Sequence, residues 1–400
     1  MRLLFVADGR SPIALNWIRH FIESGYEVHL ASTFPCRPEL DLASFHLAPV
    51  AFSGLKSETK PGASATAKRQ GIWGSATVRL RTRVRQWLGP LTLPSAAARL
   101  RGIITSVQPD LVHAMRIPYE GMLAALATPS QPLLVSVWGN DFTLHAPTTP
   151  LMRRYTRLAL AGASALHTDC RRDLKLARKW GFAQEKPGVV LPGAGGIQLD
   201  MFYPPQRQGD GAKESARDLT VINPRGFRAY VHNQVFFQAA ALVLASQPQA
   251  RFVCPTMAGE SQVLGWVQAS GIEAQVDLLP RQSRQQMAEL FRQSRVVVSP
   301  TSHDGTPNTL LEAMACGCLP VAGDIESLHE WITPGVNGLL VDPNDPKALA
   351  QAILAGLGDP ILCQNAQTHN AQLIAERADY RVVMHRAEIF YQELVAGKNQ

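Results

Sequence analysis

The sequence predicts an α/β protein made of two doubly wound domains, each built on a parallel sheet. Three observations lead to this prediction: the length of 400 residues, an alternation of apolar strands with helical patterns, and a polar break between two such series. A chain of this length exceeds the usual size of one hydrophobic core. Two such domains leave a cleft between them, and their ligands bind at the carboxyl ends of the strands.

The first domain is predicted to span residues 1–205, in which short apolar strands alternate with helical patterns. Strands are predicted at 3–8, 27–32, 110–115, 133–138, 164–169 and 188–193, and helices at 14–24, 150–161 and 170–180. Because strands alternate with helices, we expect the sheet to be parallel.

Residues 206–218 are polar and rich in proline and glycine, which indicates a linker. The second domain, 219–378, repeats the alternation. Its strands are predicted at 220–225, 250–255, 273–279, 295–300, 318–323 and 338–342. Helices are predicted at 233–246 and 283–293, and a third begins after residue 306. A fourth ends at Ile332, and a fifth begins at Pro346 with Asp345 as its cap. The tail, 379–400, contains one more amphipathic helix, 380–396.

Composition and charge narrow the class of protein. Hydrophobic residues make up 46% and charged residues 18%, which is typical of a globular enzyme and excludes a disordered chain or a coiled coil. Six scattered cysteines indicate neither a disulfide framework nor a zinc site, so we expect a cytoplasmic protein. The net charge of +7 suggests an anionic partner.

Residues 53–101 interrupt the alternation with a basic insertion, whose first part looks mobile. Within it, residues 77–91 predict a basic amphipathic helix. Its apolar face consists of Leu80, Val84, Trp87, Leu88 and Leu91, and its other faces carry Arg79, Arg81, Arg83 and Arg85. This helix would lie on the inner face of an anionic membrane or bind a phosphorylated acceptor. The alternative is a surface helix that packs on its own domain.

The stretch SHDGTPNTLLEAMACG (302–317) predicts a loop at a strand end, followed by a helix. Thr306 is placed to cap this helix and Pro307 suits its first position. The free N–H groups and the dipole at the helix N-terminus form an anion site. Glu312 is expected roughly six residues inside, about 9 Å along the axis, with Asp304 on the other side of the N-terminus.

A nucleotide diphosphate sugar matches this arrangement of charges. Its diphosphate would lie on the helix N-terminus, its hexose hydroxyls would reach Asp304, and its ribose hydroxyls would reach Glu312. The residues expected around the donor are His303, Gly305, Thr306, Pro307, Asn308 and Thr309. The alternative is a capping loop aspartate with an ordinary helical glutamate, and His303 could equally be an exposed loop residue.

The same stretch resembles the retaining glycosyltransferases of family 4, which have the GT-B fold. Their signature is E-x7-E followed by an A-M-A-x-G-x-P-V run. Here it reads Asp304-x7-Glu312 and then AMACGCLPVAG (313–323), so the first acid is Asp rather than Glu. The resemblance implies two Rossmann-like domains that face each other across a cleft, with the C-terminal helix crossing back onto the N-terminal domain.

The resemblance extends over nearly the whole chain. PDLVHAM (109–115) is similar to the family's histidine-bearing strand end, with His113 at the first histidine and Met115 at the second. VWGND (137–141) matches a G-x-D pattern through Gly139 and Asp141. MRLLFVADGRSP is similar to the first strand and acceptor-side loop, and VVLPGAGGIQLDMFYP to the segment that closes the first domain.

The family usually places an arginine and a lysine on the donor diphosphate, in a pattern like G-R-x4-K. In INPRGFRAYVHNQ (222–234), Arg225 fits the arginine, and Tyr230 stands at the lysine position. Arg228 is the nearest cation that could replace the lysine. The alternative for both arginines is a surface or loop position.

The resemblance implies transfer of a hexosyl group from a UDP- or GDP-linked sugar, with retention of configuration, by a front-face mechanism. The acceptor would be a glycan, a lipid-linked glycan or a small molecule. Asp304, His113 and Asp141 are the catalytic candidates, although His113 could be a core residue and Asp141 a loop cap. No cofactor is implied, and without a D-x-D motif no metal ion is expected to be essential.

Three other classes of protein were compared with this interpretation. A dehydrogenase needs G-x-G-x-x-G after the first strand, which ADGRSPIAL does not supply. A catalytically idle sugar-nucleotide binder or partner subunit remains an alternative because of Asp304 and Met115. A nucleic-acid protein is disfavoured because the arginines carry few interleaved aromatic residues.

Overall fold

The computed structural model describes residues 1–53, 85–127, 129–205, 217 and 219–397. The chain forms two compact units. Unit 1 consists of Met1–Gly195 and Met384–Gln400, and unit 2 consists of Gly196–Val383. Apart from Arg217, the predicted linker at 206–218 lies outside the described residues, as does most of the basic insertion, so Arg79, Arg81 and Arg83 are not described.

Unit 1 contains a seven-stranded sheet in the order β3-β2-β1-β4-β5-β6-β7, in which all neighbouring strands are parallel. The strands are β1 (Arg2–Ala7), β2 (Glu27–Ser32), β3 (Ser44–Leu47), β4 (Leu111–Ala114), β5 (Leu133–Val137), β6 (Ala165–Thr168) and β7 (Gly188–Val190). The sequence predicted all of these except β3, an edge strand with alternating burial.

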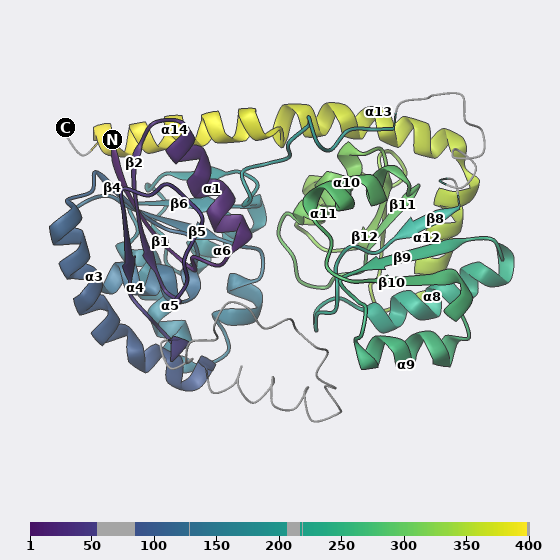
Figure 1. Cartoon of the computed structure of the whole chain (residues 1–400), viewed down its shortest axis with the longest axis horizontal. Helices are drawn as coiled ribbons and strands as arrows, with labels where there is room; N and C mark the ends of the chain where they lie inside the picture. Colours follow the sequence, from purple (N-terminus) through teal and green to yellow (C-terminus); the bar gives the residue numbers. More distant parts are fainter. Residues whose placement is uncertain (54–84, 128, 206–216, 218, 398–400) are drawn as a thin grey trace. The chain divides into compact units, whose positions relative to one another are not determined.

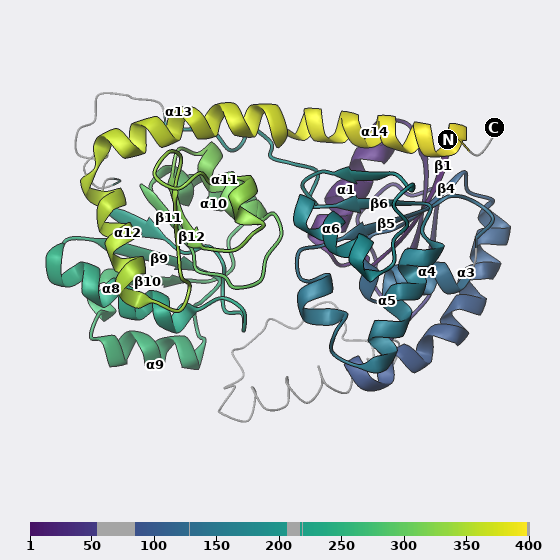
Figure 2. The same ribbon diagram turned by 180° about the vertical axis from the view of Figure 1, so that it is seen from behind.

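Helices cover both faces of this sheet (Figures 1 and 2). They are α1 (Pro12–Glu23), α3 (Leu93–Val107), α4 (Met122–Ala127), α5 (Pro150–Gly162), α6 (Arg171–Trp180) and the last part of α14 (Tyr380–Ala396). Val112 and Ala114 of β4 belong to the core that α3, α4 and α5 cover. His113, between them, points to the opposite face, because successive strand side chains alternate. That face is covered by α1 and α14, which contribute Trp17 and Tyr391.

Unit 2 contains a six-stranded sheet in the order β10-β9-β8-β11-β12-β13, again with parallel neighbours. The strands are β8 (Thr220–Ile222), β9 (Arg251–Pro255), β10 (Val276–Leu279), β11 (Val296–Ser299), β12 (Leu319–Gly323) and β13 (Leu339–Val341). The prediction of two parallel α/β sheets is therefore confirmed.

The helices of unit 2 also divide between the two faces of the sheet. They are α8 (Asn233–Ser246), α9 (Ser261–Ser270), α10 (Arg284–Arg292), α11 (Asn308–Ala315), α12 (Pro346–Gly358) and α13 (Pro360–Arg377). Val296 and Val298 of β11 face the core beneath α8 and α12, and Val297 faces the core beneath α10 and α11. The predicted helix up to Ile332 is wrong, because only a 3₁₀ turn, Leu328–Glu330, forms there.

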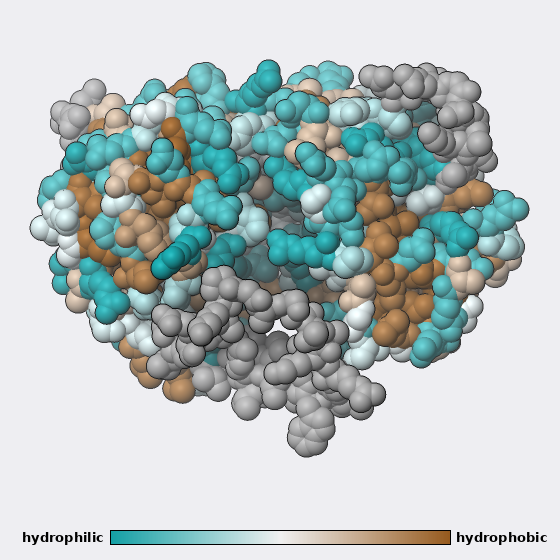
Figure 3. All heavy atoms as spheres, in the orientation of Figure 1, coloured by the Kyte–Doolittle hydropathy of each residue, from teal (hydrophilic) through white to brown (hydrophobic). Residues whose placement is uncertain are grey.

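On the face shown in Figure 3, each unit carries apolar patches among polar residues. Among the helices of the described residues, none has the length and hydropathy needed to cross a membrane. Asp345 caps α12 as predicted, through bonds from the backbone N–H groups of Lys347 and Ala348.

Candidate functional site

The loop after β11 forms the centre of the candidate donor site in unit 2. The chain leaves the sheet at Ser299, and Thr301 forms a bridge with Val231 of the loop that follows β8. Gly323 at the end of β12 allows this close approach, because a Cβ there would lie 2.2 Å from the Thr301 carbonyl oxygen. The ends of β8, β11 and β12 therefore converge on residues 301–307.

Helix α11 begins at Asn308, one position later than the sequence predicted. Pro307 occupies the N-cap position and no side chain caps the helix, so the prediction that Thr306 is the cap is wrong. The Thr306 hydroxyl instead accepts a hydrogen bond of 3.0 Å from the indole of Trp331. Among the described residues, the N–H groups of Asn308 and Thr309 have no hydrogen-bond acceptor. They remain available to an anion at the positive end of the helix dipole.

Asp304 and Arg225 form an ion pair beside this helix start. One guanidinium nitrogen of Arg225 donates to the carboxylate of Asp304, and another donates to the Thr309 hydroxyl at 3.3 Å. The second Asp304 oxygen accepts from the Gly305 N–H at 3.1 Å. The sequence prediction places Asp304 at the hexose and Arg225 at the diphosphate, and in this structure the two side chains contact and neutralise each other.

Several buried polar atoms around this helix start have no hydrogen-bond partner among the described residues. They are Arg225 Nε, His232 Nε2, Ser299 Oγ, Thr301 Oγ1 and Asn308 Oδ1. A buried polar atom without a partner is costly, so a cluster of them indicates a place where a ligand or water completes the bonding.

Glu312 is the fifth residue of α11, not the sixth as the sequence suggested, so it lies about 6 Å along the axis. Its nearest cation is Arg284, whose guanidinium nitrogen lies 3.8 Å from the carboxylate. Burial raises the pKa of Glu312 to about 7, and the charge of Arg284 only partly opposes this. The carboxyl is therefore close to half-protonated at neutral pH.

The remaining donor candidates lie in the same region with different exposure. Arg228 is exposed and donates a bond of 2.9 Å to the hydroxyl of Tyr230, the residue at the expected lysine position. His303 is partly buried next to Asp304. Its charge contributes to lowering the pKa of His232, after the larger effect of burial.

His113 lies in a closed chain of hydrogen bonds in the core of unit 1. Both ring nitrogens are used, by the Tyr391 hydroxyl and by Ser136 Oγ at 2.7 Å. Only 1% of its surface is exposed. The alternative of a core histidine thus accounts for this placement, in which both ring nitrogens are bonded to protein groups.

The protons in this chain can be assigned from one end to the other. The Leu191 carbonyl can only accept, so His167 Nε2 donates to it at 3.0 Å. His167 Nδ1 then accepts from Ser136, Ser136 accepts from His113, and His113 accepts from Tyr391, which in turn accepts from Trp17 Nε1. Both imidazoles must be neutral, and burial lowers the pKa of each, that of His167 to about 4.

Asp141 is also buried in unit 1, at 1% exposure, and serves as a loop anchor. It accepts from Arg116 Nε at 2.8 Å and from the Trp138 N–H at 3.1 Å. The neighbouring Gly139 N–H donates to Asp169 at 3.2 Å. Asp141 therefore acts as a loop cap, the alternative that the sequence left open. It also orients the side chain of Arg116, which lines a pocket.

The sequence analysis did not find that pocket, whose lining includes Asp8, Arg85, Tyr119 and Glu120. Part of this pocket could have been found from the sequence, because its residues lie at the ends of predicted strands or in the basic insertion. The left-handed backbone of Tyr119, with φ 73° and ψ −55°, could not, because nothing in the sequence indicates it.

Two parallel, doubly wound units, one of which carries a candidate anion site at the front of α11, are the features of the GT-B architecture. The model for the glycosyl transferase 4-like domain matches residues 9–193, and that for glycosyl transferases group 1 matches residues 213–372. The chain belongs to this family of glycosyltransferases, known as GT4, as the sequence resemblance predicted.

Solved structures and curated relatives agree with this family. Sucrose-phosphate synthase from Thermosynechococcus elongatus superposes with a TM-score of 0.76 at 16% identity, over 99% of this chain and 100% of that one. Anabaena HepE in complex with UDP-glucose gives 0.68 at 16%, over 98% and 100%. D-inositol 3-phosphate glycosyltransferase of Rhodococcus opacus is 25% identical over 46% of this chain and 43% of its own length. The chain thus spans less than half of that relative.

Proposed function

We propose that the protein transfers a hexosyl group from a UDP- or GDP-linked sugar to a hydroxyl group of its acceptor, with retention of anomeric configuration. The observation that carries this proposal is the cluster of unpartnered polar atoms at the front of α11, flanked by Arg225 and two carboxyl groups. A diphosphate would complete the bonding of the helix N–H groups and of Arg225.

Donor binding would require a change of partners at Arg225. In the structure its charge is neutralised by Asp304. When a diphosphate arrives, Arg225 would donate to it, and Asp304 would accept from hydroxyl groups of the hexose. The N–H groups of Asn308 and Thr309 would meet the phosphate oxygens, and Glu312 would accept from the ribose hydroxyls.

In the proposed reaction, the nucleotide diphosphate leaves from the face on which the acceptor attacks. As the bond to the anomeric carbon breaks, negative charge grows on the diphosphate oxygen. The front of α11 and Arg225 would stabilise this charge, and Arg228 would assist from its exposed position. The leaving phosphate can take the acceptor proton, so no buried base such as His113 is needed.

UDP-glucose is the first donor to test, because HepE, a structural neighbour, has been solved with UDP-glucose. The experiment is incubation with UDP- and GDP-linked hexoses, measuring nucleotide release and thermal shift. Release from at least one donor is expected. Donor binding without any release, even when acceptors are added, would favour the idle binder instead.

Membrane attachment is a second part of the proposal, limited to the described end of the basic insertion. Trp87, Leu88 and Leu91 expose 58%, 47% and 61% of their surface. The exposed arginines Arg153, Arg154 and Arg157 line a surface pocket at the start of α5, whose cap Thr149 donates to the Gln86 carbonyl. Apolar side chains beside clustered arginines suit the surface of an anionic membrane, which would keep a lipid-linked acceptor nearby.

Vesicle sedimentation tests this attachment directly. The protein is expected to sediment with vesicles containing phosphatidylglycerol and not with vesicles of phosphatidylcholine alone. A variant carrying Trp87→Ser and Leu91→Ser should remain in the supernatant while its melting temperature changes little. Equal sedimentation with both kinds of vesicle, or none, would remove the membrane from the proposal.

A further inference from the structure

A pocket of about 300 Å³ lies in unit 1 at the carboxyl ends of four neighbouring strands. Asp8 follows β1, Phe34 follows β2, Arg116 follows β4 and Trp138 follows β5. In doubly wound sheets this edge holds ligands, because the loops after the strands converge there. A cavity of this size accommodates a group as large as a monosaccharide.

Two arginines give the pocket its charge. The guanidinium carbon of Arg85 lies 4.9 Å from the ring centroid of Phe34 and 4.9 Å from that of Tyr119. Its Nε atom is buried and has no hydrogen-bond partner among the described residues. Arg116 lies over the ring of Trp138 at 5.4 Å. Arg10 also lies over the Phe34 ring, at 3.8 Å. The two rings attract the Arg85 guanidinium, and its buried Nε remains a donor for a ligand.

The carboxyl groups around the pocket do not neutralise Arg85. Asp8 is paired with Arg10 at 2.9 Å and Asp141 with Arg116 at 2.8 Å. Glu120 accepts a bond of 2.8 Å from Thr33, and burial raises its pKa to about 7, so it carries only part of a charge at neutral pH. Within the described part of the chain, no carboxylate forms an ion pair with Arg85, although its charge partly opposes the rise in the pKa of Glu120. A partly buried cation without an ion-pair partner favours an anion.

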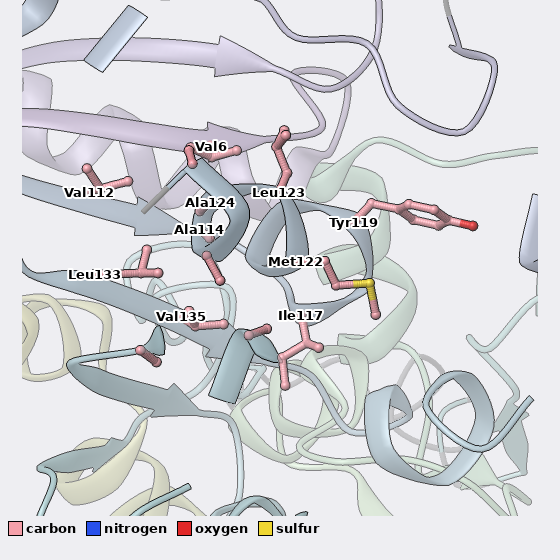
Figure 4. Close-up of a cluster of buried hydrophobic side chains, with 14 of the residues drawn as sticks. Val6, Val112, Ala114, Ile117, Tyr119, Met122, Leu123, Ala124, Leu133 and Val135 are labelled. Atoms are coloured by element: carbon pink, nitrogen blue, oxygen red, sulfur yellow. The ribbon is translucent and has the colours of Figure 1, made fainter. Parts of the chain in front are cut away.

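Tyr119 holds the backbone that carries Arg85. Its hydroxyl donates a bond of 2.6 Å to the Arg85 carbonyl. Figure 4 shows this side chain directed away from the labelled aliphatic residues of the core. The left-handed φ of 73° is unfavourable for a tyrosine. A strained backbone that positions a pocket residue is a feature of ligand sites rather than of ordinary packing.

We propose that this pocket binds an acceptor sugar or polyol that carries an oxyanion, a phosphate or a carboxylate, held by Arg85 with Arg116 beside it. The proposal rests on the proposed glycosyl transfer and adds the chemical class of the acceptor. Hydroxyl groups of the acceptor bond to Asp8 and Glu120. The planar guanidinium of Arg85 matches the two oxygens of a carboxylate or phosphate, and Tyr119 is its positioning residue.

The test is calorimetric binding of four probes to the full chain without donor: glucose 6-phosphate, glucuronate, glucose and inorganic phosphate. At least one anionic sugar is expected to bind ten or more times more tightly than glucose. Tighter binding of glucose 6-phosphate would indicate a phosphate on the acceptor, and tighter binding of glucuronate a carboxylate. Equal binding of glucose and both anionic sugars, or binding of none, would overturn the proposal.

Two arginine variants locate the site. Arg85→Gln is expected to weaken binding of the best anionic probe by ten times or more, so that its affinity approaches that of glucose. Arg99→Gln removes an exposed arginine of the same unit that does not line the pocket, so its affinity should equal that of the wild type. Equal affinity in Arg85→Gln and the wild type would overturn the assignment.

The anionic acceptor and the proposed glycosyl transfer can be contradicted independently of each other. The binding measurement contains no nucleotide sugar, whereas donor hydrolysis by the wild-type protein contains no acceptor. Anion binding by a protein that releases no nucleotide from any donor, even when acceptors are added, would contradict the glycosyl transfer and keep the pocket. Hydrolysis without anion binding would keep the transfer and overturn the anionic acceptor.

Discussion

Strands β4 and β11 hold equivalent places in the two sheets, yet the polar groups near them differ in kind. In both sheets this strand lies beside the first strand, on the side opposite the second one. His113, inside β4, is locked into a chain of hydrogen bonds in which each donor has an acceptor. The loop beyond β11 instead holds an ion pair and several atoms without partners.

The difference shows that the position of a polar residue relative to the strand end indicates a ligand site better than its residue type does. A side chain inside a strand points to a face that helices cover, so a polar one must be satisfied by the protein itself. Residues past the strand end reach the edge of the sheet where ligands bind. In unit 1 these are Arg116, Tyr119 and Glu120, and they line the pocket.

The largest expected effect comes from Arg225→Ala. Removing the cation that would face the diphosphate should lower kcat/KM for donor turnover by about 10²–10³-fold. Steady-state kinetics with UDP-glucose, or with the donor found in the panel, measures this. Arg251→Ala is the matched control, because Arg251 lies at the amino end of β9, the opposite edge of the same sheet. A similar loss in both variants would mean that Arg225 has no special role.

The second-largest effect is expected from acid pH, which should destabilise unit 1 through its buried histidines. Burial lowers the pKa of His167 from the usual 6.5 to about 4 in the folded protein. A depressed histidine pKa contributes stability above pH 6.5 that is lost as pH falls toward 4, about 3 kcal/mol for this group. NMR signals of the His113 and His167 rings should show no titration between pH 8 and 5. Titration of either ring above pH 6 would contradict the neutral chain.

Tyr391→Phe should lower the free energy of unfolding by about 2 kcal/mol, because Trp17 Nε1 and His113 Nδ1 both lose their partner. Urea denaturation measures this. Tyr26→Phe is the control, since the Tyr26 hydroxyl makes one exposed bond, to Gln392. Donor affinity should not change in either variant. If Tyr391→Phe is as stable as Tyr26→Phe, the chain contributes little to the stability of unit 1.

The smallest effect is expected from Glu312→Gln, about tenfold in donor affinity at pH 8. The wild type should bind donor better as pH rises through 7, where the carboxyl ionises, and the variant should lack this dependence. Because the pKa is raised, the stability associated with this group is present below pH 4.5 and lost as pH rises through 7. The unliganded variant should therefore be at least as stable as the wild type at pH 8. Identical pH profiles would remove the ribose role.

The sequence predicted the parallel sheets well because buried parallel strands are short apolar runs with clear ends. It also predicted one donor site for Asp304, Glu312 and Arg225, from the motif and the loop at the strand end, and that assignment stays a prediction. It did not predict that Asp304 and Arg225 would pair, since their separation in sequence is 79 residues. The pocket around Arg85 was missed because stacking between Phe34 and Tyr119 depends on tertiary packing.

A structure of the protein with bound UDP tests the central claim most directly. The account predicts phosphate oxygens within hydrogen-bond distance of the Asn308 and Thr309 N–H groups, with Arg225 turned from Asp304 to the diphosphate and the ribose at Glu312. A diphosphate bound away from the front of α11, with the Arg225–Asp304 pair intact, would contradict it.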